Sequence, residues 1–173
     1  MSLNLSNKPK TYNMQVPFDA LSDEARVWIY PASRPFTVDE CDEITTTLHA
    51  FLTQWTAHGA SLNAGVSIPY NRFIVIALDE SQQEATGCSI DASVKIIQEI
   101  EATYAVTLLD KMNVSFKQGE YITYKPLIDF KKMVKSKAVT ENTIVFNNLV
   151  VNKEEFLTQW EVPAHQSWHA RYF

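Results

Sequence analysis

The stretch Phe-Ile-Val-Ile-Ala-Leu-Asp-Glu at residues 73–80 begins with six apolar residues in succession. A strand that is apolar on both faces belongs inside a sheet that other elements cover from both sides. A short polar connector then leads to Thr-Gly-Cys-Ser-Ile-Asp at residues 86–91, which has the composition of a helix start. The sequence therefore predicts a central strand over residues 72–78 and a helix over residues 90–104.

The residues before this stretch predict two strands with a helix between them. Arg-Val-Trp-Ile-Tyr at residues 26–30 is a compact strand that a proline ends. Thr37 and Glu40 have the spacing of a capping box, and apolar residues then recur at helical spacing. We therefore expect a helix over residues 38–57 and a further strand over residues 62–68.

With a last strand over residues 112–117, the predicted order is strand, helix, strand, strand, helix, strand. This is the order of a ferredoxin-like βαββαβ core, which belongs to the α+β class. We expect one sheet with both helices on the same face, to which a hairpin and a basic helix over residues 127–137 are added. The residues predicted to lie in the core are Leu48, Trp55, Ile76 and Val94.

The length of 173 residues is sufficient for one domain with a sizeable core. We predict an N-terminal arm over residues 1–20 and a single α+β domain over residues 21–173. The chain ends in Trp-His-Ala-Arg-Tyr-Phe, and three exposed rings would form a sticky patch on an acidic protein. We therefore expect the C-terminal segment to dock on the domain.

Composition and charge limit the classes of function. Hydrophobic residues make up 46% and charged residues 20% of the chain, as in an ordinary globular protein. The sequence shows neither a signal peptide nor an apolar stretch long enough to span a bilayer. We therefore expect a soluble, cytoplasmic protein with no membrane partner, in which Cys41 and Cys88 are free thiols.

The glycine content argues against nucleotide hydrolysis. The chain has only four glycines, and no two of them have the spacing of a P-loop or of a dinucleotide-binding loop. Asp79 and Glu80 follow an apolar strand, as the second acidic motif of P-loop enzymes does. Without a glycine loop to wrap the phosphates this pair cannot serve that role, so we exclude P-loop ATPase activity.

Four stretches together resemble a known family. They are Arg-Val-Trp-Ile-Tyr at 26–30, Gly-Cys-Ser-Ile-Asp at 87–91, Val-Phe-Asn-Asn-Leu-Val at 145–150 and Trp-His-Ala-Arg-Tyr-Phe at 168–173. The chain is similar over residues 17–173 to an uncharacterised family of small bacterial proteins that often carries the label "ABC transporter ATPase". The resemblance implies a bacterial protein and supplies no catalytic residue, and the label conflicts with the missing glycine loop.

The candidate ligand-binding residues are Cys88, Ser89 and Asp91 at a helix start and Asp79 after the central strand. Free N–H groups at a helix start can hold an anion or stabilise a thiolate. A small anionic ligand is therefore one expected occupant. Two alternatives stay open: Cys88 only packs while Ser89 or Asp91 caps the helix, or Cys88 is a nucleophile that a distant histidine activates.

A second pattern could bind nucleic acid. Seven of the fifteen Lys and Arg lie between Lys111 and Lys137, and Phe116, Tyr121 and Tyr124 fall in the same region. Aromatic side chains beside lysines can stack on bases, although ordinary cross-strand packing is the simpler explanation for them. The net charge of −5 argues against this function, so nucleic acid is an unlikely partner.

These patterns favour binding without catalysis. We predict a non-catalytic interaction module whose partner is a small anionic ligand, another protein or a second copy of the chain. A thiol-dependent enzyme built on Cys88 is the first alternative, and a weak nucleic-acid binder through residues 111–137 is the second. We expect no cofactor and no metal, because His165 and His169 lack a third ligand nearby.

Overall fold

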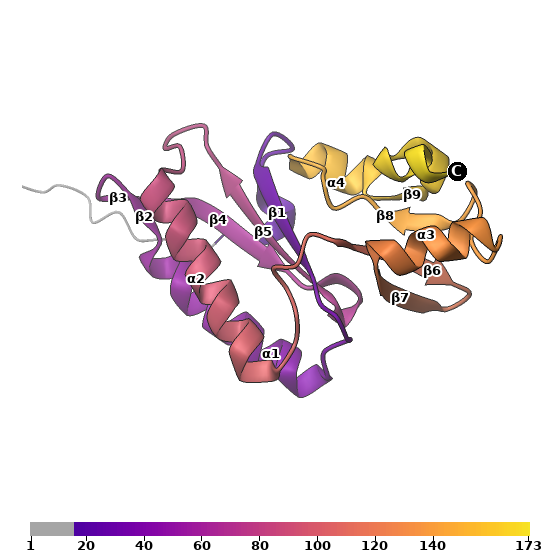
Figure 1. Cartoon of the computed structure of the whole chain (residues 1–173). Coiled ribbons are helices and arrows are strands. Elements are labelled where there is room, and N and C mark those ends of the chain that lie inside the picture. The colour runs from indigo at the N-terminus through magenta and orange to yellow at the C-terminus, as the bar shows by residue number, and fades with distance from the viewer. Residues whose placement is uncertain (1–15) are drawn as a thin grey trace, which may run out of the picture.

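The computed structural model describes residues 16–173, which form antiparallel sheets and α-helices (Figure 1). The strands are β1 (Arg26–Pro31), β2 (Thr56–Ala57), β3 (Ala60–Ser61), β4 (Asn63–Ser67), β5 (Phe73–Asp79), β6 (Asn113–Gln118), β7 (Tyr121–Pro126), β8 (Ile144–Phe146) and β9 (Glu161–Pro163). The helices are α1 (Val38–Gln54), α2 (Gly87–Tyr104), α3 (Leu127–Lys135) and α4 (Lys153–Gln159). The first sheet has the order β1-β5-β4 and the second β7-β6-β8-β9, so the chain belongs to the α+β class, as predicted.

β5 is the central strand of the first sheet. Each residue from Phe73 to Leu78 has a relative exposure of 0%. β5 pairs antiparallel with β1 on one side and with β4 on the other, so that Ile76 lies opposite both Trp28 and Val66. The unbroken apolar run thus forms the buried central strand that the sequence predicts.

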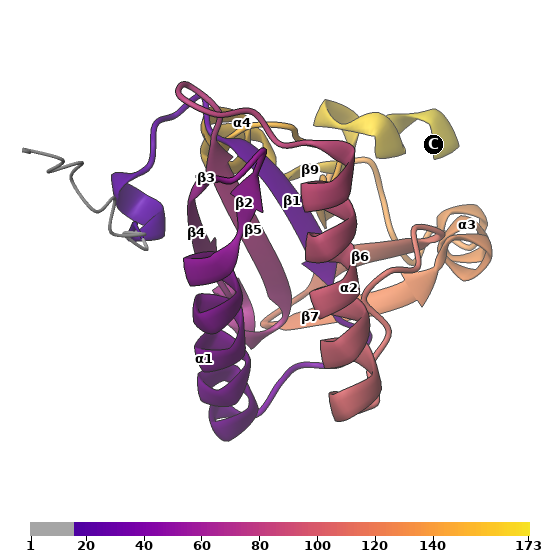
Figure 2. The same ribbon diagram turned by 90° about the vertical axis from the view of Figure 1, so that its left-hand side faces the viewer.

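Helices α1 and α2 cover one face of this sheet (Figure 2). Each helix begins with a capping box, in which Thr37 pairs with Glu40 and Thr86 with Ser89. A capping box satisfies main-chain N–H groups that a helix start leaves without partners. The placement of both helices on one face is confirmed. The predicted core residues that are buried are Leu48, Trp55 and Ile76.

A second apolar cluster covers the other face of the first sheet. Phe73 of β5 contacts Phe146 of β8 and the ring of Trp160, with centroid separations of 4.6 and 5.0 Å. Phe18, in a short 3-10 helix, and Phe156 of α4 belong to the same cluster. Such ring pairs contribute about 0.5–1.5 kcal/mol each beyond their buried area. The C-terminal third of the chain therefore packs directly on the central strand.

The N-terminal residues cross β4 at Gly65. A Cβ atom at Gly65 would lie 2.7 Å from the carbonyl oxygen of Val16 and 3.1 Å from the Cα atom of Phe18. Only glycine allows main chain to approach this closely. Part of the predicted arm thus lies against β4, whereas residues 1–15 are outside the described residues. The division of the chain at residue 20 stays a prediction.

β6 does not join the first sheet. It pairs along its length with β7, and Phe116 also lies opposite Val145 of β8. The ferredoxin-like arrangement is therefore not confirmed, because the first sheet has three strands and the expected fourth strand belongs to the second. A physical reason is that strands near in the chain take both edges of β6. β7 follows in a tight hairpin and β8 after about 25 residues, whereas pairing with β1 closes a loop of about 80 residues.

The C-terminal segment docks on the second sheet, as expected. Phe130 of α3 is fully buried and contacts Phe116 of β6, with ring centroids 5.4 Å apart. From the C-terminal end, the rings of His169 and Phe173 contact Phe130 at 6.0 and 6.2 Å. Trp168 and Tyr172 pack against the same cluster and are half-buried.

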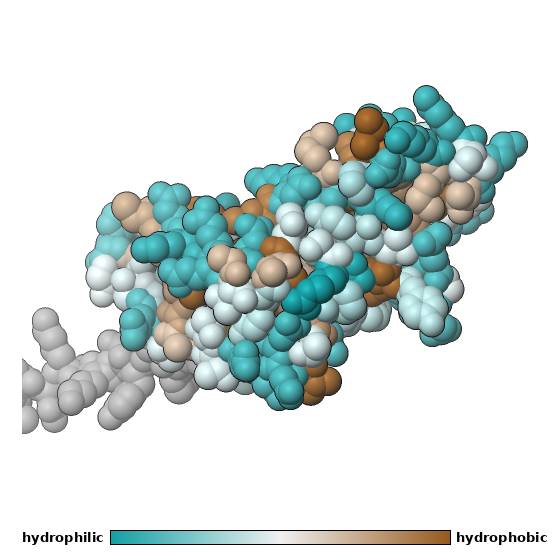
Figure 3. Space-filling model, turned by 60° about the horizontal axis from the view of Figure 1, so that its bottom comes forward, coloured by the Kyte–Doolittle hydropathy of each residue, from teal (hydrophilic) through white to brown (hydrophobic). Residues whose placement is uncertain are grey.

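The surface seen in Figure 3 is mainly hydrophilic, with small separate hydrophobic patches. Scattered apolar residues of this kind are normal on a folded protein. Among residues 16–173, no helix has both the length and the apolar character that crossing a membrane requires.

The central core predicts a large effect of Leu48→Ala. Leu48 has a relative exposure of 0%, so the truncation leaves a cavity beneath the first sheet. We expect the free energy of unfolding, measured in urea, to fall by about 2–5 kcal/mol. Val38→Ala is the matched control, since Val38 is 67% exposed on the same helix and should change stability by no more than about 0.5 kcal/mol. Equal effects of the two substitutions would contradict this packing.

The docked C-terminal segment predicts that removing residues 166–173 destabilises the protein. The deletion uncovers Phe130, and each large ring that returns to water costs roughly 1.5–3 kcal/mol. We expect the melting temperature to fall by about 5–10 °C in a thermal scan. Ala170→Ser, at an exposed position of the same segment, should leave the melting curve unchanged. A truncated protein that melts with the full chain would show that the segment contributes nothing.

Candidate ligand-binding groove

A groove of about 520 Å³ runs along the outer edge of β1. It lies on the side of β1 away from β5, where the last strand of a βαββαβ unit would pair. Its volume falls within the roughly 300–1,000 Å³ typical of ligand pockets. The main apolar residues that line it are Trp28, Ile29, Val94, Leu108, Leu149 and Trp168.

Val94 was predicted to lie in the core, but it is half-buried and lines this groove. The prediction assumed that a fourth strand would cover this side of α2. Because β6 belongs to the other sheet, Val94 faces the space that such a strand would fill.

The segment that replaces the fourth strand forms one wall of the groove. Helix α2 ends at Ala105, which adopts the left-handed conformation with φ of +50°. The Glu101 carboxylate then accepts hydrogen bonds from the N–H groups of Leu108 and Leu109, at 2.7 and 3.0 Å. These contacts fix residues 105–109 against the end of α2, with the Leu108 side chain buried.

The outer edge of β1 is paired only at its beginning. Val27 N–H donates to the carbonyl of Val151 at 3.0 Å, and Lys153 N–H donates to the carbonyl of Ala25 at 2.9 Å. Within residues 16–173, no strand continues this pairing beyond the bridge between Arg26 and residue 152. The rest of the edge therefore faces the groove.

Arg72 connects the two sheets behind the groove. Its buried guanidinium donates to the carbonyl oxygens of Ala32 and Ser33, which follow β1, at 3.3 and 3.1 Å. It also donates to the carbonyl of Ile122 in β7 at 2.8 Å. Burial lowers the pKa of Arg72 from its usual value, and three carbonyl acceptors keep the charge hydrogen-bonded.

A polar cluster of Tyr70, Lys117 and Glu161 forms a second connection between the sheets. The Glu161 carboxylate accepts hydrogen bonds from the Tyr70 hydroxyl and the Lys117 ammonium. Partial burial opposes ionisation of Glu161, but these two donors lower its pKa. Lys117 also lies 5.2 Å from the centre of the Tyr70 ring.

Trp168 lines the groove, and its neighbour His169 is fully buried. The two rings stack with centroids 3.9 Å apart, and Nδ1 of His169 lies 2.7 Å from the Ser167 hydroxyl. Burial lowers the pKa of His169 to about 4, so the ring is neutral at pH 7. The Trp168 indole N–H is buried without a partner among the described residues.

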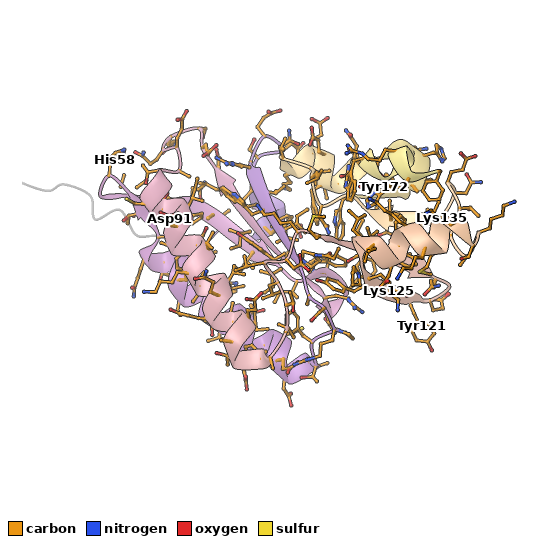
Figure 4. The ribbon with its side chains drawn as sticks, viewed as in Figure 1. His58, Asp91, Tyr121, Lys125, Lys135 and Tyr172 are labelled. Carbon is orange, nitrogen blue, oxygen red and sulfur yellow. The ribbon has the colours of Figure 1, made fainter. Side chains whose placement is uncertain are left out.

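The four residues predicted to bind a ligand do not line this groove. Ser89 is buried, and its hydroxyl completes the capping box with Thr86. Asp79 accepts a hydrogen bond from the N–H of Ser81 in a turn, at 2.9 Å. Cys88 and Asp91 are exposed, and Figure 4 shows Asp91 on α2. Their use as an anion site stays a prediction, with helix capping as the observed role of Ser89.

Cys88 lies in a separate shallow hollow together with Phe51, Trp55 and Ser89. No histidine or carboxylate is among the residues that line this hollow. His58, labelled in Figure 4, lies in the turn between β2 and β3 and is exposed. A nucleophilic thiol needs a base within hydrogen-bond reach, so this geometry gives the enzyme alternative no support.

The lysines of residues 111–137 are dispersed. Lys111 lines the groove, Lys117 binds Glu161, and Lys132 pairs with Asp129 on α3 at 3.1 Å. Figure 4 shows Lys125 on β7 and Lys135 on α3, both in the half of the molecule that holds the second sheet.

The aromatic residues of the same region are not a stacking surface. Phe116 is fully buried and Tyr124 is half-buried, which leaves Tyr121 exposed. The three rings therefore do not form one exposed surface on which bases could stack, which weakens the nucleic-acid alternative. Among residues 16–173, no group of three or more His, Cys, Asp or Glu could hold a metal ion.

Sequence reasoning missed the groove because its residues come from five separate segments. They belong to β1, α2, residues 108–113, residues 146–149 and Trp168. One signal was available in the sequence: Leu109 and Leu149 are apolar residues in segments with neither helical nor strand periodicity, and neither is fully buried. Such residues indicate a surface that the chain itself does not bury by regular secondary structure.

Comparisons with models of known protein families, with curated proteins and with solved structures found no match to this chain. The family resemblance therefore stays a prediction that depends on its four sequence stretches. The groove and its chemistry are the basis for a functional proposal.

The buried His169 predicts a specific loss of stability in acid. Folding depresses its pKa from 6.5 to about 4, so its contribution is complete above pH 6.5 and is lost as the pH falls towards 4. We expect urea unfolding to show a decrease on the order of 1–3 kcal/mol over this range. In His169→Phe, which cannot titrate, that part of the pH dependence should disappear. Identical pH profiles for the two proteins would contradict a buried neutral His169.

Proposed function

We propose that this protein is a non-catalytic binding module and that its ligand occupies the groove along β1. One observation carries the proposal: a cavity of about 520 Å³, lined mainly by apolar side chains, lies where a fourth strand would complete the first sheet. Covering apolar surface yields about 25 cal/mol per Å², so an occupant would be stabilised by the hydrophobic effect.

The charges of the groove favour an uncharged, apolar ligand. Asp110 and Lys111 are the charged residues that line it, and they are neighbours of opposite sign. The sequence predicts a small anionic ligand at the helix start near Cys88, which is outside the groove. In the groove such an anion would be repelled by the Asp110 carboxylate as well as attracted by the Lys111 ammonium. The remaining polar groups belong to the amides of Asn113 and Asn148, the Tyr30 hydroxyl and two tryptophan indoles, all of them neutral, which suits a neutral ligand.

The two amide side chains of the groove have structural partners. Asn113 donates to the carbonyl of Asp110, and Asn148 accepts a hydrogen bond from the Trp160 indole at 2.9 Å. They hold the walls in place and offer no nucleophile. A binding role accounts for this arrangement without requiring any residue to react.

Two exposed leucines provide a matched test of the groove. Leu149 lines the groove and is 66% exposed, whereas Leu157 lies on α4 outside it and is 61% exposed. Titration with the neutral dye Nile red, followed by its fluorescence, should show saturable binding to the wild-type protein. A lysine at an apolar contact carries a desolvation cost, so Leu149→Lys should weaken binding at least about tenfold.

Leu157→Lys should bind the dye as the wild-type protein does. Melting curves of both variants should match the wild-type curve, because both leucines are largely exposed. If Nile red does not saturate, or if the two variants lose affinity equally, the groove is not the ligand site.

A further inference from the structure

We propose that the natural occupant of the groove is an extended peptide segment of another protein, which adds to the outer edge of β1 as a fourth strand. This inference rests on the proposed binding function and specifies its ligand.

The main chain of β1 offers an unused donor and acceptor in the groove. Ala32 N–H donates to the carbonyl of Arg72 beside β5, and pairs in an antiparallel ladder alternate. Tyr30 and Trp28 therefore direct their main-chain groups towards β5, whereas Val27 and Ile29 direct theirs outward. Val27 uses its N–H to bind Val151, whose own N–H donates to Glu155. Within residues 16–173 the outward groups without a hydrogen bond are therefore the N–H and C=O of Ile29 and the C=O of Val27.

The chain itself shows that this edge accepts another main chain. Residues 151–153 pair antiparallel with residues 25–27 through two hydrogen bonds. Residues 147–150, which precede this pairing in the chain, form a turn in which Val150 N–H donates to the carbonyl of Asn147 at 3.3 Å, so they do not pair with β1. A peptide strand would continue the same antiparallel pairing where residues 147–150 turn away, and would extend it along β1 for about 10 Å.

The walls of the groove suit the two faces of a strand. Successive side chains of an added strand point to opposite faces of the sheet. One face meets Val94 and Leu108, on the side covered by α2, and the other meets Phe146 and Leu149. An occupant with apolar residues on both faces fits, and a small ligand would leave the main-chain groups of Ile29 without partners.

Charge and shape favour a peptide over a second copy of the chain. The lining charges of Asp110 and Lys111 cancel, so the central part of the occupant is uncharged. In a second copy, β1 lies at the bottom of the same groove, between α2 and residues 146–149. Two such recessed edges cannot pair directly, whereas a single extended segment can enter.

The test uses the full chain and peptides selected from a phage-displayed library of random twelve-residue sequences. The best binder is synthesised with fluorescein, and its dissociation constant is measured by anisotropy for the wild-type protein, Ile29→Pro and Ile29→Ala. Proline removes the outward N–H without removing a bond to β5. Ile29→Ala removes apolar lining and should itself weaken binding, so it is the reference for the main chain: we expect Ile29→Pro to bind at least about tenfold more weakly than Ile29→Ala.

Amide exchange provides a second measurement that needs no variant. In the wild-type protein, saturating peptide should slow exchange of the Ile29 N–H, followed by NMR, at least about tenfold. The proposal is overturned if the library yields no binder, if Ile29→Pro binds as tightly as Ile29→Ala, or if the exchange rate of Ile29 does not change. Saturable Nile red binding together with any of these results would leave the binding function standing and remove only the peptide.

Other occupants would be recognised in the same experiment. If peptides bind only after residues 1–15 are deleted, the groove belongs to this chain's own N-terminal segment. If sedimentation shows a dimer that Ile29→Pro converts to a monomer, the groove belongs to a second copy. Either result would overturn the proposal.

Discussion

The buried guanidinium of Arg72 is the contact on which the relative position of the two sheets depends. It binds carbonyl oxygens that follow β1 and one in β7, so a single side chain satisfies acceptors from both sheets. A buried acceptor without a partner costs about 1–3 kcal/mol, which makes this contact costly to break. The rings of Phe73, Phe146 and Trp160 add apolar contact across the same junction. This junction holds the second sheet beside β1. Residues of the second sheet then line the groove, but none of its strands pairs with β1.

An open strand edge is usually a hazard, because it can pair with any other exposed strand. Here the outer edge of β1 is protected in three ways. Residues 151–153 occupy its beginning, Pro31 removes a donor at its end, and the groove recesses the part between them. The exposed strand of another sheet cannot reach this recessed edge, whereas a single extended peptide can enter the groove. Such an edge is suited to selective binding, which agrees with the proposed role.

The candidate site residues illustrate how one local pattern serves two purposes. A cluster of Gly, Cys, Ser and Asp at a helix start suits an anion site, but it suits a capping box equally well. In the structure Ser89 reciprocates with Thr86, and its carbonyl accepts the Trp55 indole N–H at 2.8 Å. The sequence could not separate these outcomes, because both depend on the same main-chain N–H groups. What distinguishes them is which side chains the fold brings near, and none of the lining of the Cys88 hollow is a base.

Features that depend on neighbouring residues could be predicted from the sequence. The apolar run of β5, the capping box of Thr37 with Glu40 and the burial of Leu48 follow from local pattern, and so does the docking of the C-terminal rings. Tertiary structure alone decided where β6 pairs, because a strand that is apolar on one face can complete either sheet. Its choice of β7 and β8 left Val94 half-buried and Ile29 at an open edge. The groove is the consequence of that pairing, and it brings together five segments whose proximity no local pattern encodes.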